Sequence, residues 1–158
     1  MIQRAAKLLS GGTVTAMAAY LAYDYQTCHP FRKMHGYDVA GAWIRFHNTF
    51  RPSITYPSMT LQDLNKYNGH NGRPTYFSSD GRIWDVSDSE TFHSSYGFFE
   101  GKDATFCLAK MSMEKSEINQ TNWDALADKE WESLYSWTKY FSEKYMIRGR
   151  LKEYAPKR

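Results

Sequence analysis

The sequence predicts an α+β domain over residues 57–154, preceded by an N-terminal helix and an irregular extension. Three observations lead to this prediction. Apolar residues recur every three or four positions in two stretches, the pair Asp80-Gly81 separates two short apolar runs, and residues 8–23 carry no charge. The first spacing is typical of helices, and Asp-Gly is typical of a tight β-hairpin turn. We therefore divide the chain into an N-terminal helix, an extension, a domain and a short tail, at residues 1–24, 25–56, 57–154 and 155–158.

The positive charge of the chain is concentrated in its first third. The first 58 residues contain six Lys or Arg and two acidic residues, while the whole chain of 158 residues has a net charge of +3. The remainder is therefore nearly neutral, which argues against a nucleic-acid-binding domain. Basic groups near the N-terminus suit an anionic membrane or acidic partner subunits, and they equally fit an ordinary solvated face.

Residues 8–23 form an uncharged run that follows Arg4 and Lys7 and precedes Asp24. The run is shorter than the roughly 20 apolar residues of a membrane-spanning helix, and it contains glycine and threonine. Three interpretations stay open: a mitochondrial targeting segment, a membrane anchor, and a helix packed against partner subunits. We expect either the membrane-anchor-like helix or the packed helix.

Residues 25–56 show prolines and aromatic residues in no clean period, apart from a short helix expected at residues 39–46. So long an irregular stretch is unusual inside a compact domain. We interpret it as an extension that lies on another protein surface. The alternative is that it covers the core of its own domain. In either case the aromatic side chains would supply contact area, namely Tyr37, Trp43, Phe46 and Phe50.

The domain is expected to begin with a short helix and a hairpin. Thr60 is a suitable N-cap three residues ahead of Asp63, and Gly69 ends the turn that follows. Strands are predicted at residues 75–77 and 83–86, on either side of the Asp-Gly turn.

Two more helices are predicted in the second half of the domain. Residues 101–111 give a short one, in which Cys107 is expected as a small buried apolar residue. Residues 128–145 give a longer one with an apolar stripe, and the cations Arg148 and Arg150 follow its last turn. Helices around a small hairpin-containing sheet make an α+β domain.

An enzyme is not expected from this sequence. It contains no zinc-protease or nucleophile-elbow motif, no phosphate-binding loop and no dinucleotide fingerprint. The chain therefore belongs more naturally to a class of binding or structural proteins.

Four stretches of the domain resemble the membrane-associated progesterone receptor (MAPR) family, a branch of the cytochrome-b5-like haem/steroid-binding fold. They occur in the order of the family and include the run YGFFEGKDA that begins at Tyr96. The resemblance implies a cytochrome-b5-like fold and, as is common in the family, an N-terminal membrane anchor. The matching stretches are residues 59–69, 80–87, 96–109 and 137–151.

The same resemblance implies a haem b site. In haem-binding members the tyrosine at the position of Tyr96 is the axial iron ligand, and a phenolate can ligate ferric haem. Lys144 and Tyr145 match a Lys-Tyr pair near the family's pocket. Lys144 would meet a haem propionate as a cation, and Tyr145 would donate a hydrogen bond to the ligand tyrosine.

The segment before Tyr96 departs from the family pattern. Residues 92–95 form a shorter loop than the family has, and they contain neither glycine nor proline. His93 lies near an upstream tyrosine of the family and is an alternative iron ligand, as histidines are in ordinary cytochrome b5 domains. A third interpretation treats Tyr96 as a core residue in a fold that has lost its cofactor.

Two functions are therefore predicted. The first is a membrane-anchored haem protein of MAPR type, at a mitochondrial membrane (inner membrane favoured) or at the endoplasmic reticulum membrane. The second is a structural accessory subunit of a mitochondrial inner-membrane complex that keeps the fold without haem and contacts other subunits. Steroid binding is a third possibility, which follows from the family alone.

Overall fold

The computed structural model of the protein describes residues 11–27, 39–50 and 56–156. The chain forms two compact units, Met1–Phe50 and Arg51–Arg158. The first unit contains helices α2 (Gly11–Thr27) and α4 (Val39–Phe50). The short helix expected at residues 39–46 is thus confirmed and extends to Phe50, whereas residues 8–10 of the uncharged run lie outside the described residues.

The contacts between helices α2 and α4 include a pair of aromatic rings and an ion pair. Tyr20 meets Phe46 with ring centroids 5.3 Å apart. The guanidinium of Arg45 donates to both carboxylate oxygens of Asp24, at 3.0 and 2.6 Å, and both side chains are largely buried. A bidentate pair of this kind both neutralises the two charges and restrains the orientation of the two side chains.

The expected N-terminal helix is present as α2. Within residues 11–27, 39–50 and 56–156, no helix combines the length and the apolar character that a membrane crossing needs. Helix α2 continues past the uncharged run and includes Asp24, whose charge is matched by Arg45 on α4.

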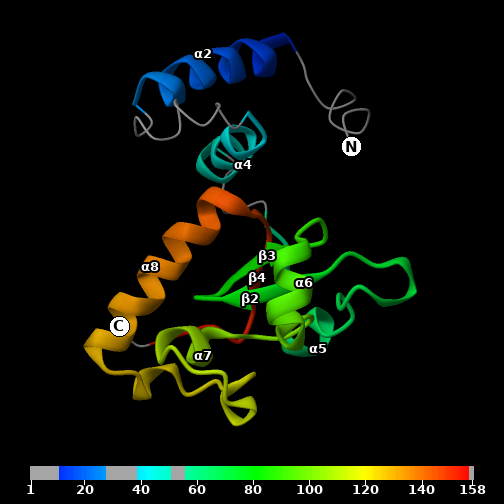
Figure 1. Ribbon diagram of the computed structural model, residues 1–158, viewed down its shortest axis with the longest axis vertical. Helices are drawn as coiled ribbons and strands as arrows, with labels where there is room; N and C mark the ends of the chain where they lie inside the picture. The colour runs from blue at the N-terminus through cyan, green and yellow to red at the C-terminus, as the bar shows by residue number, and fades with distance from the viewer. Residues whose placement is uncertain (1–10, 28–38, 51–55, 157–158) are drawn as a thin grey trace. The chain divides into compact units, whose positions relative to one another are not determined.

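The second unit is built on a four-stranded sheet in the order β1-β4-β3-β2 (Figure 1). Strand β1 (Ser58–Met59) runs parallel to β4 (Met146–Leu151), and the other neighbours are antiparallel. Strands β2 (Tyr76–Ser79) and β3 (Arg82–Asp85) form the predicted hairpin. Both turn residues have the positive φ that this turn type requires, 50° for Asp80 and 68° for Gly81.

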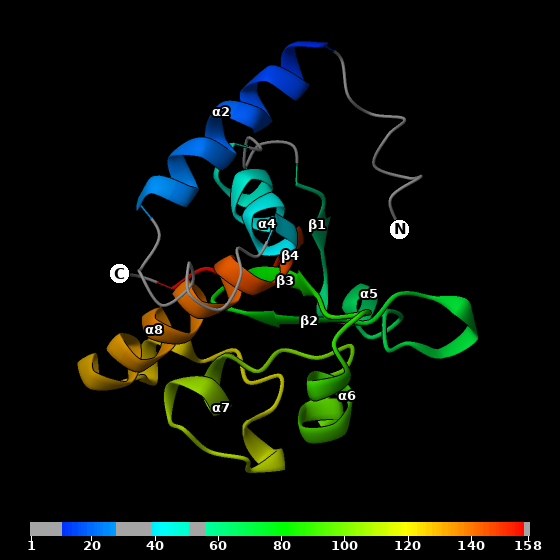
Figure 2. The same ribbon diagram turned by 45° about the horizontal axis from the view of Figure 1, so that its top comes forward.

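The described part of this unit, residues 56–156, also contains the α-helices α5 (Leu61–Leu64), α6 (Glu90–Tyr96), α7 (Thr105–Ala109) and α8 (Asp128–Lys144), together with short 3-10 helices. Figures 1 and 2 show α6, α7 and α8 surrounding strand β2. Thr60 caps α5 as predicted. Its hydroxyl oxygen accepts a hydrogen bond from the Asp63 amide at 3.1 Å, and the Asp63 carboxylate accepts one from the Thr60 hydroxyl. The expected helices at residues 101–111 and 128–145 are confirmed as α7 and α8, with α7 shorter than expected.

One prediction about local structure was wrong, and one strand was not predicted. Residues 92–95 were expected to form a loop, but they belong to α6, in which the Ser89 hydroxyl accepts a hydrogen bond from the Phe92 amide at 3.3 Å. Arg148 and Arg150 follow the last turn of α8 as expected, but the residues after α8 also form strand β4, which was not predicted. Arg148 lies in that strand and donates to Asp85 on β3 at 2.8 Å.

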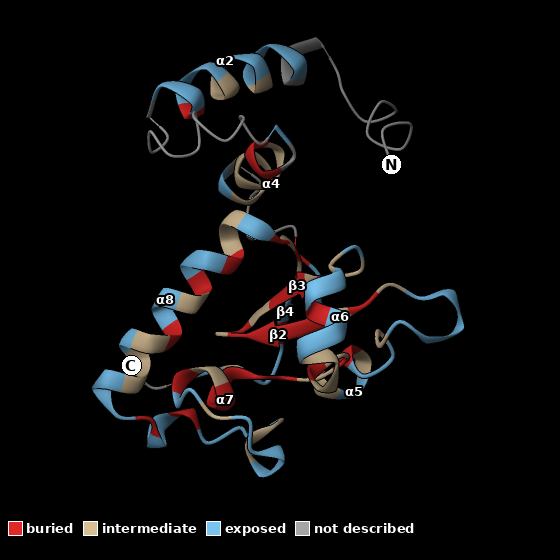
Figure 3. Cartoon of the chain, in the orientation of Figure 1, coloured by how far each residue is buried: buried red, intermediate tan, exposed pale blue. Residues whose placement is uncertain are grey.

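The core of this unit contains two apolar clusters, each of which includes buried residues of the sheet. Figure 3 shows buried residues along the strands and on the helices that face them. One cluster is centred on Phe77 and Trp84, which are 1% and 0% exposed. Phe92 of α6 and Phe141 of α8 both pack on Phe77, with ring centroids 4.7 and 5.2 Å away. The other cluster joins α5, α7 and the N-terminal half of α8. The first cluster supports the cavity described next.

Candidate functional site

A cavity of about 490 Å³ opens between α6, α7 and α8. This volume lies within the range of about 300–1,000 Å³ that is usual for small-molecule sites. Most of its walls are aromatic or aliphatic, with a few polar groups at the edge. The lining residues include Phe92, Tyr96, Phe99, Met113, Lys144 and Tyr145.

Tyr96 contributes its ring to the wall of this cavity. It is the last residue of α6, and its φ of −131° turns the chain into the 3-10 helix η4 (Gly97–Phe99). The half-buried ring stacks nearly parallel to Phe99, at 4° and a centroid distance of 6.5 Å. The structure shows no hydrogen bond from the Tyr96 hydroxyl to any residue within its described ranges. The phenol oxygen can therefore meet a ligand.

Lys144 and Tyr145 reach the same cavity from the end of α8. The ammonium group of Lys144 donates to the Tyr140 hydroxyl at 3.0 Å and lies over the rings of Tyr140 and Tyr145. The hydrogen bond to Tyr140 raises the pKa of Lys144 above its usual value. Lys144 is therefore a cation at neutral pH, placed at the edge of an apolar cavity.

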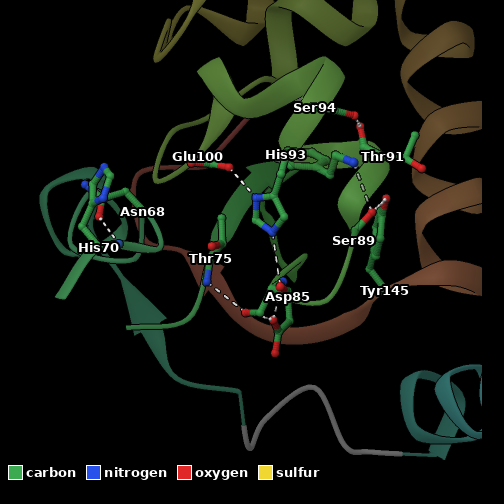
Figure 4. A network of polar contacts seen from close by, with 12 residues as sticks. Asn68, His70, Thr75, Asp85, Ser89, Thr91, His93, Ser94, Glu100 and Tyr145 are labelled. Carbon is green, nitrogen blue, oxygen red and sulfur yellow. Dashed lines mark hydrogen bonds and ion pairs between the residues drawn. The ribbon is translucent and has the colours of Figure 1, made fainter. Parts of the chain in front are cut away.

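Tyr145 has a different partner from the one that the family resemblance implied. Its hydroxyl lies 3.2 Å from Ser89 Oγ, at the start of α6, and the ring is 8% exposed (Figure 4). The expected hydrogen bond between Tyr145 and Tyr96 does not occur among the described residues. Tyr145 instead joins the end of α8 to the helix that carries Tyr96.

His93 lies on α6 but does not line the cavity. Its Nδ1 is 2.6 Å from Glu100 Oε1, and its Nε2 is 3.2 Å from the Ser87 carbonyl oxygen (Figure 4). Both ring nitrogens are thus engaged outside the cavity. The structure brings Tyr96, Lys144 and Tyr145 together and separates His93 from them.

Several residues of the cavity escaped prediction from the sequence. Phe77 and Phe141 were expected only as parts of a strand and a helix, and both reach the wall because their elements converge. Met111 and Met113 follow α7, and they are 69% and 59% exposed at the cavity edge. The sequence offered one signal for this part of the wall, a pair of methionines that follows an apolar run. Methionine is common at adaptable binding surfaces.

Asp103 anchors the segment that follows Tyr96. It is 1% exposed, and its carboxylate accepts hydrogen bonds from Ser78 Oγ at 2.5 Å and Thr105 Oγ1 at 2.9 Å. Burial raises the pKa of Asp103 to about 6, although these hydrogen bonds oppose the shift. The carboxylate thereby ties the Tyr96 segment to β2, from which Ser78 comes.

Comparison with known proteins identifies relatives of this chain, although no family model matches it. The probable steroid-binding protein 3 of Arabidopsis thaliana is 34% identical over 96 residues, which cover 58% of this chain and 95% of that protein. A solved Arabidopsis thaliana protein described as having a cytochrome b5 like fold aligns with a TM-score of 0.52 and 30% identity. That alignment covers 64% of this chain and 95% of the other.

Human membrane-associated progesterone receptor component 2 is a further relative, 30% identical over 71% of this chain and 52% of its own length. The chain belongs to the membrane-associated progesterone receptor family. The chain spans about half the length of this relative, and 45% of the Arabidopsis membrane steroid-binding protein 2. The predicted family and the cytochrome-b5-like fold are therefore confirmed.

Proposed function

We propose that this MAPR-family protein is a binding protein, not an enzyme, and that it holds haem b in the cavity beside Tyr96. The observation that carries the proposal is the Tyr96 phenol at the wall of an apolar cavity of about 490 Å³, without a hydrogen-bond partner in the described chain. A phenolate oxygen is a known ligand of ferric haem.

The donor set around the cavity fits haem in two further respects. The stacked rings of Tyr96 and Phe99, together with Phe92, give the cavity an aromatic wall suited to a flat macrocycle. Lys144 offers a cation at the edge, where a propionate would reach solvent. A haem held there would supply an iron centre for one-electron chemistry. The protein's own residues would bind it, orient it and shield one part from water.

Haem titration of the purified protein tests the proposal. We expect a Soret absorbance band that saturates at one haem per chain, and at least a tenfold loss of affinity in Tyr96→Phe, because the iron loses its ligand. Tyr135→Phe is the matched control, since Tyr135 on α8 is 70% exposed and lies outside the cavity. Saturable binding that is equal in all three proteins would exclude Tyr96 as the ligand.

A steroid is the second candidate for the same cavity. Relatives from Arabidopsis thaliana and rice are described as steroid-binding proteins. The mainly apolar wall with a few polar groups, such as the Tyr96 hydroxyl, suits a rigid apolar ligand as well. Adding progesterone to the haem titration tests whether the two ligands share this cavity. Competitive displacement of haem supports a shared cavity, whereas retention of haem at saturating steroid contradicts a shared cavity.

We further propose that the protein acts at a membrane. The support is the description of several relatives as membrane proteins, together with the basic excess of the first 58 residues. Co-flotation of the full chain with anionic vesicles, but not with neutral ones, is the expected result. The mitochondrial inner membrane, with the endoplasmic reticulum as the alternative, is the location to test by imaging a tagged protein. The relatives do not favour the accessory-subunit alternative.

A further inference from the structure

The segment that carries Tyr96 is held from outside the cavity by one histidine. His93 sits in the middle of the segment from Ser87 to Glu100 and contacts both of its ends. Its Nδ1 lies 2.6 Å from Glu100 Oε1, and its Nε2 lies 3.2 Å from the Ser87 carbonyl oxygen (Figure 4). The imidazole therefore bridges the segment that precedes α6 and the residue that follows η4.

This bridge bears on Tyr96 because α6 is too short to be stable by itself. The helix has seven residues, and isolated helices of this length do not persist in water. Its position therefore depends on contacts with the rest of the domain. Tyr145 supplies one at Ser89, and Phe92 supplies another on Phe77. Tyr145, Phe92 and Phe77 all line the cavity. The His93 bridge supplies a restraint outside the cavity, about one helical turn before Tyr96.

We propose that the His93–Glu100 pair positions Tyr96 at the cavity wall, so that the affinity for the ligand follows the protonation of His93. This inference rests on the proposed haem site. It assigns a role in ligand binding to two residues, His93 and Glu100, that do not line the cavity. His93 is a positioning residue here, since it touches the carboxylate and the carbonyl oxygen and not the ligand.

The charges around His93 set the direction of this dependence. Glu100 raises the pKa of His93 above its ordinary value, and the Ser87 carbonyl adds to the effect. On the adjoining strands, Asp85 of β3 is paired with Arg148 of β4 at 2.8 Å. The bridge is therefore complete when His93 is protonated, and it weakens as the pH rises through the raised pKa. Because the His93 side chain is 37% exposed, we expect a modest effect.

The test compares haem affinity across pH in four proteins: the wild type, His93→Gln, Glu100→Gln and His70→Gln. His70 is the matched control, since it lies in the exposed turn η3 (His70–Gly72), and its backbone bonds only to near neighbours, Asn68 and Arg73. Near pH 6 we expect haem to bind His93→Gln and Glu100→Gln roughly two- to fivefold more weakly than the wild type. The ratio of the wild-type affinity to each variant's affinity should approach one at about pH 9, where His93 is neutral in the wild type. Comparing the affinities as ratios to the wild type at each pH removes any pH dependence that all four proteins share.

A measurement without haem separates this inference from the proposed function. Hydrogen exchange of the amides of residues 92–96, corrected for the intrinsic rate, should show protection that falls with pH in the wild type and His70→Gln. The protection should be low and independent of pH in His93→Gln, which lacks the titrating group, and lower than in the wild type near pH 6 in Glu100→Gln, which keeps the imidazole but loses the carboxylate. That result in a protein that takes up no haem would overturn the proposed haem site and retain the positioning pair. Equal protection and equal affinity ratios in all four proteins would overturn the inference.

Discussion

At the scale of single residues, the buried carboxyl of Asp103 makes the stability of the domain depend on pH. Its pKa is raised from 3.8 to about 6 by burial. The folded protein therefore holds this proton more tightly than the unfolded chain does. It follows that the free energy of unfolding falls as the pH rises from about 4 to about 6, and the contribution of Asp103 is at most on the order of 3 kcal/mol.

Urea unfolding at a series of pH values measures this contribution. We expect the wild type to lose stability over that interval relative to Asp103→Asn, in which the amide oxygen still accepts from Thr105. Other carboxyls titrate in both proteins and cancel in the difference. Parallel curves for the two proteins would show that Asp103 is already ionised when folded.

Gly101 shows why the segment after Tyr96 contains a glycine at that position. Its φ is +70°, and a Cβ there would lie 3.0 Å from the Asn65 carbonyl oxygen and 3.2 Å from Asn65 Cα. Gly72 has nearly the same φ, +71°, but a Cβ at that position would meet no atom within 4 Å. The two glycines thus differ in crowding and not in backbone strain.

Alanine substitutions at the two sites separate these effects. Gly72→Ala should lower the free energy of unfolding by about 1 kcal/mol, the usual cost of positive φ for alanine. Gly101→Ala should cost roughly 1–2 kcal/mol more, since the backbone of Asn65 must move. Chemical denaturation measures both values. Equal losses would mean that the close approach to Asn65 is unimportant.

At the scale of elements, local patterns predicted some parts of the fold and missed others. The hairpin was predictable because Asp80 and Gly81 adopt positive φ by their own chemistry. Helix α8 was predictable from its apolar stripe, which is the buried face in the structure. Strand β4 was missed because its position between β1 and β3 depends on partners more than 60 residues away, such as Asp85 for Arg148.

Helix α6 was missed for a related reason. Phenylalanine, histidine and serine are weak helix formers, so residues 92–95 (Phe-His-Ser-Ser) give no helix signal of their own. The helix forms because Ser89 caps it and Phe92 packs on Phe77. Among the predicted site residues, Tyr96, Lys144 and Tyr145 came from the family resemblance, and the cavity contains all three. The location of His93 outside it could not be predicted, since that depends on which face α6 turns inward.

Helix α8 supplies a direct test of the packing between the sheet and the cavity. Phe141 is 6% exposed and packs on Phe77 and Trp84, with centroids 5.2 and 5.9 Å away. Phe141→Ala should lower the free energy of unfolding by about 3–5 kcal/mol, because it removes a buried ring from the core. Tyr135→Ala on the exposed face of the same helix should change it by less than about 0.5 kcal/mol. Similar losses from both substitutions, measured by denaturation, would contradict this packing.

At the scale of the whole molecule, the chain consists of two units, each with its own internal contacts. The unit Arg51–Arg158 contains the complete sheet, both apolar clusters and the cavity. A fragment of residues 51–158 should therefore fold alone, since its core does not require residues 1–50. Circular dichroism and dispersed amide NMR resonances would show this. A fragment that stays unfolded would mean that the first unit completes the core.

Resonance Raman spectroscopy of the ferric haem complex shows whether Tyr96 binds the haem iron. Excitation into the ligand-to-iron band should reveal the ring modes of a coordinated tyrosinate in the wild type and in Tyr135→Phe. Those modes should be absent from Tyr96→Phe. A wild-type haem complex without tyrosinate modes, or modes that persist in Tyr96→Phe, would show that Tyr96 is not the iron ligand.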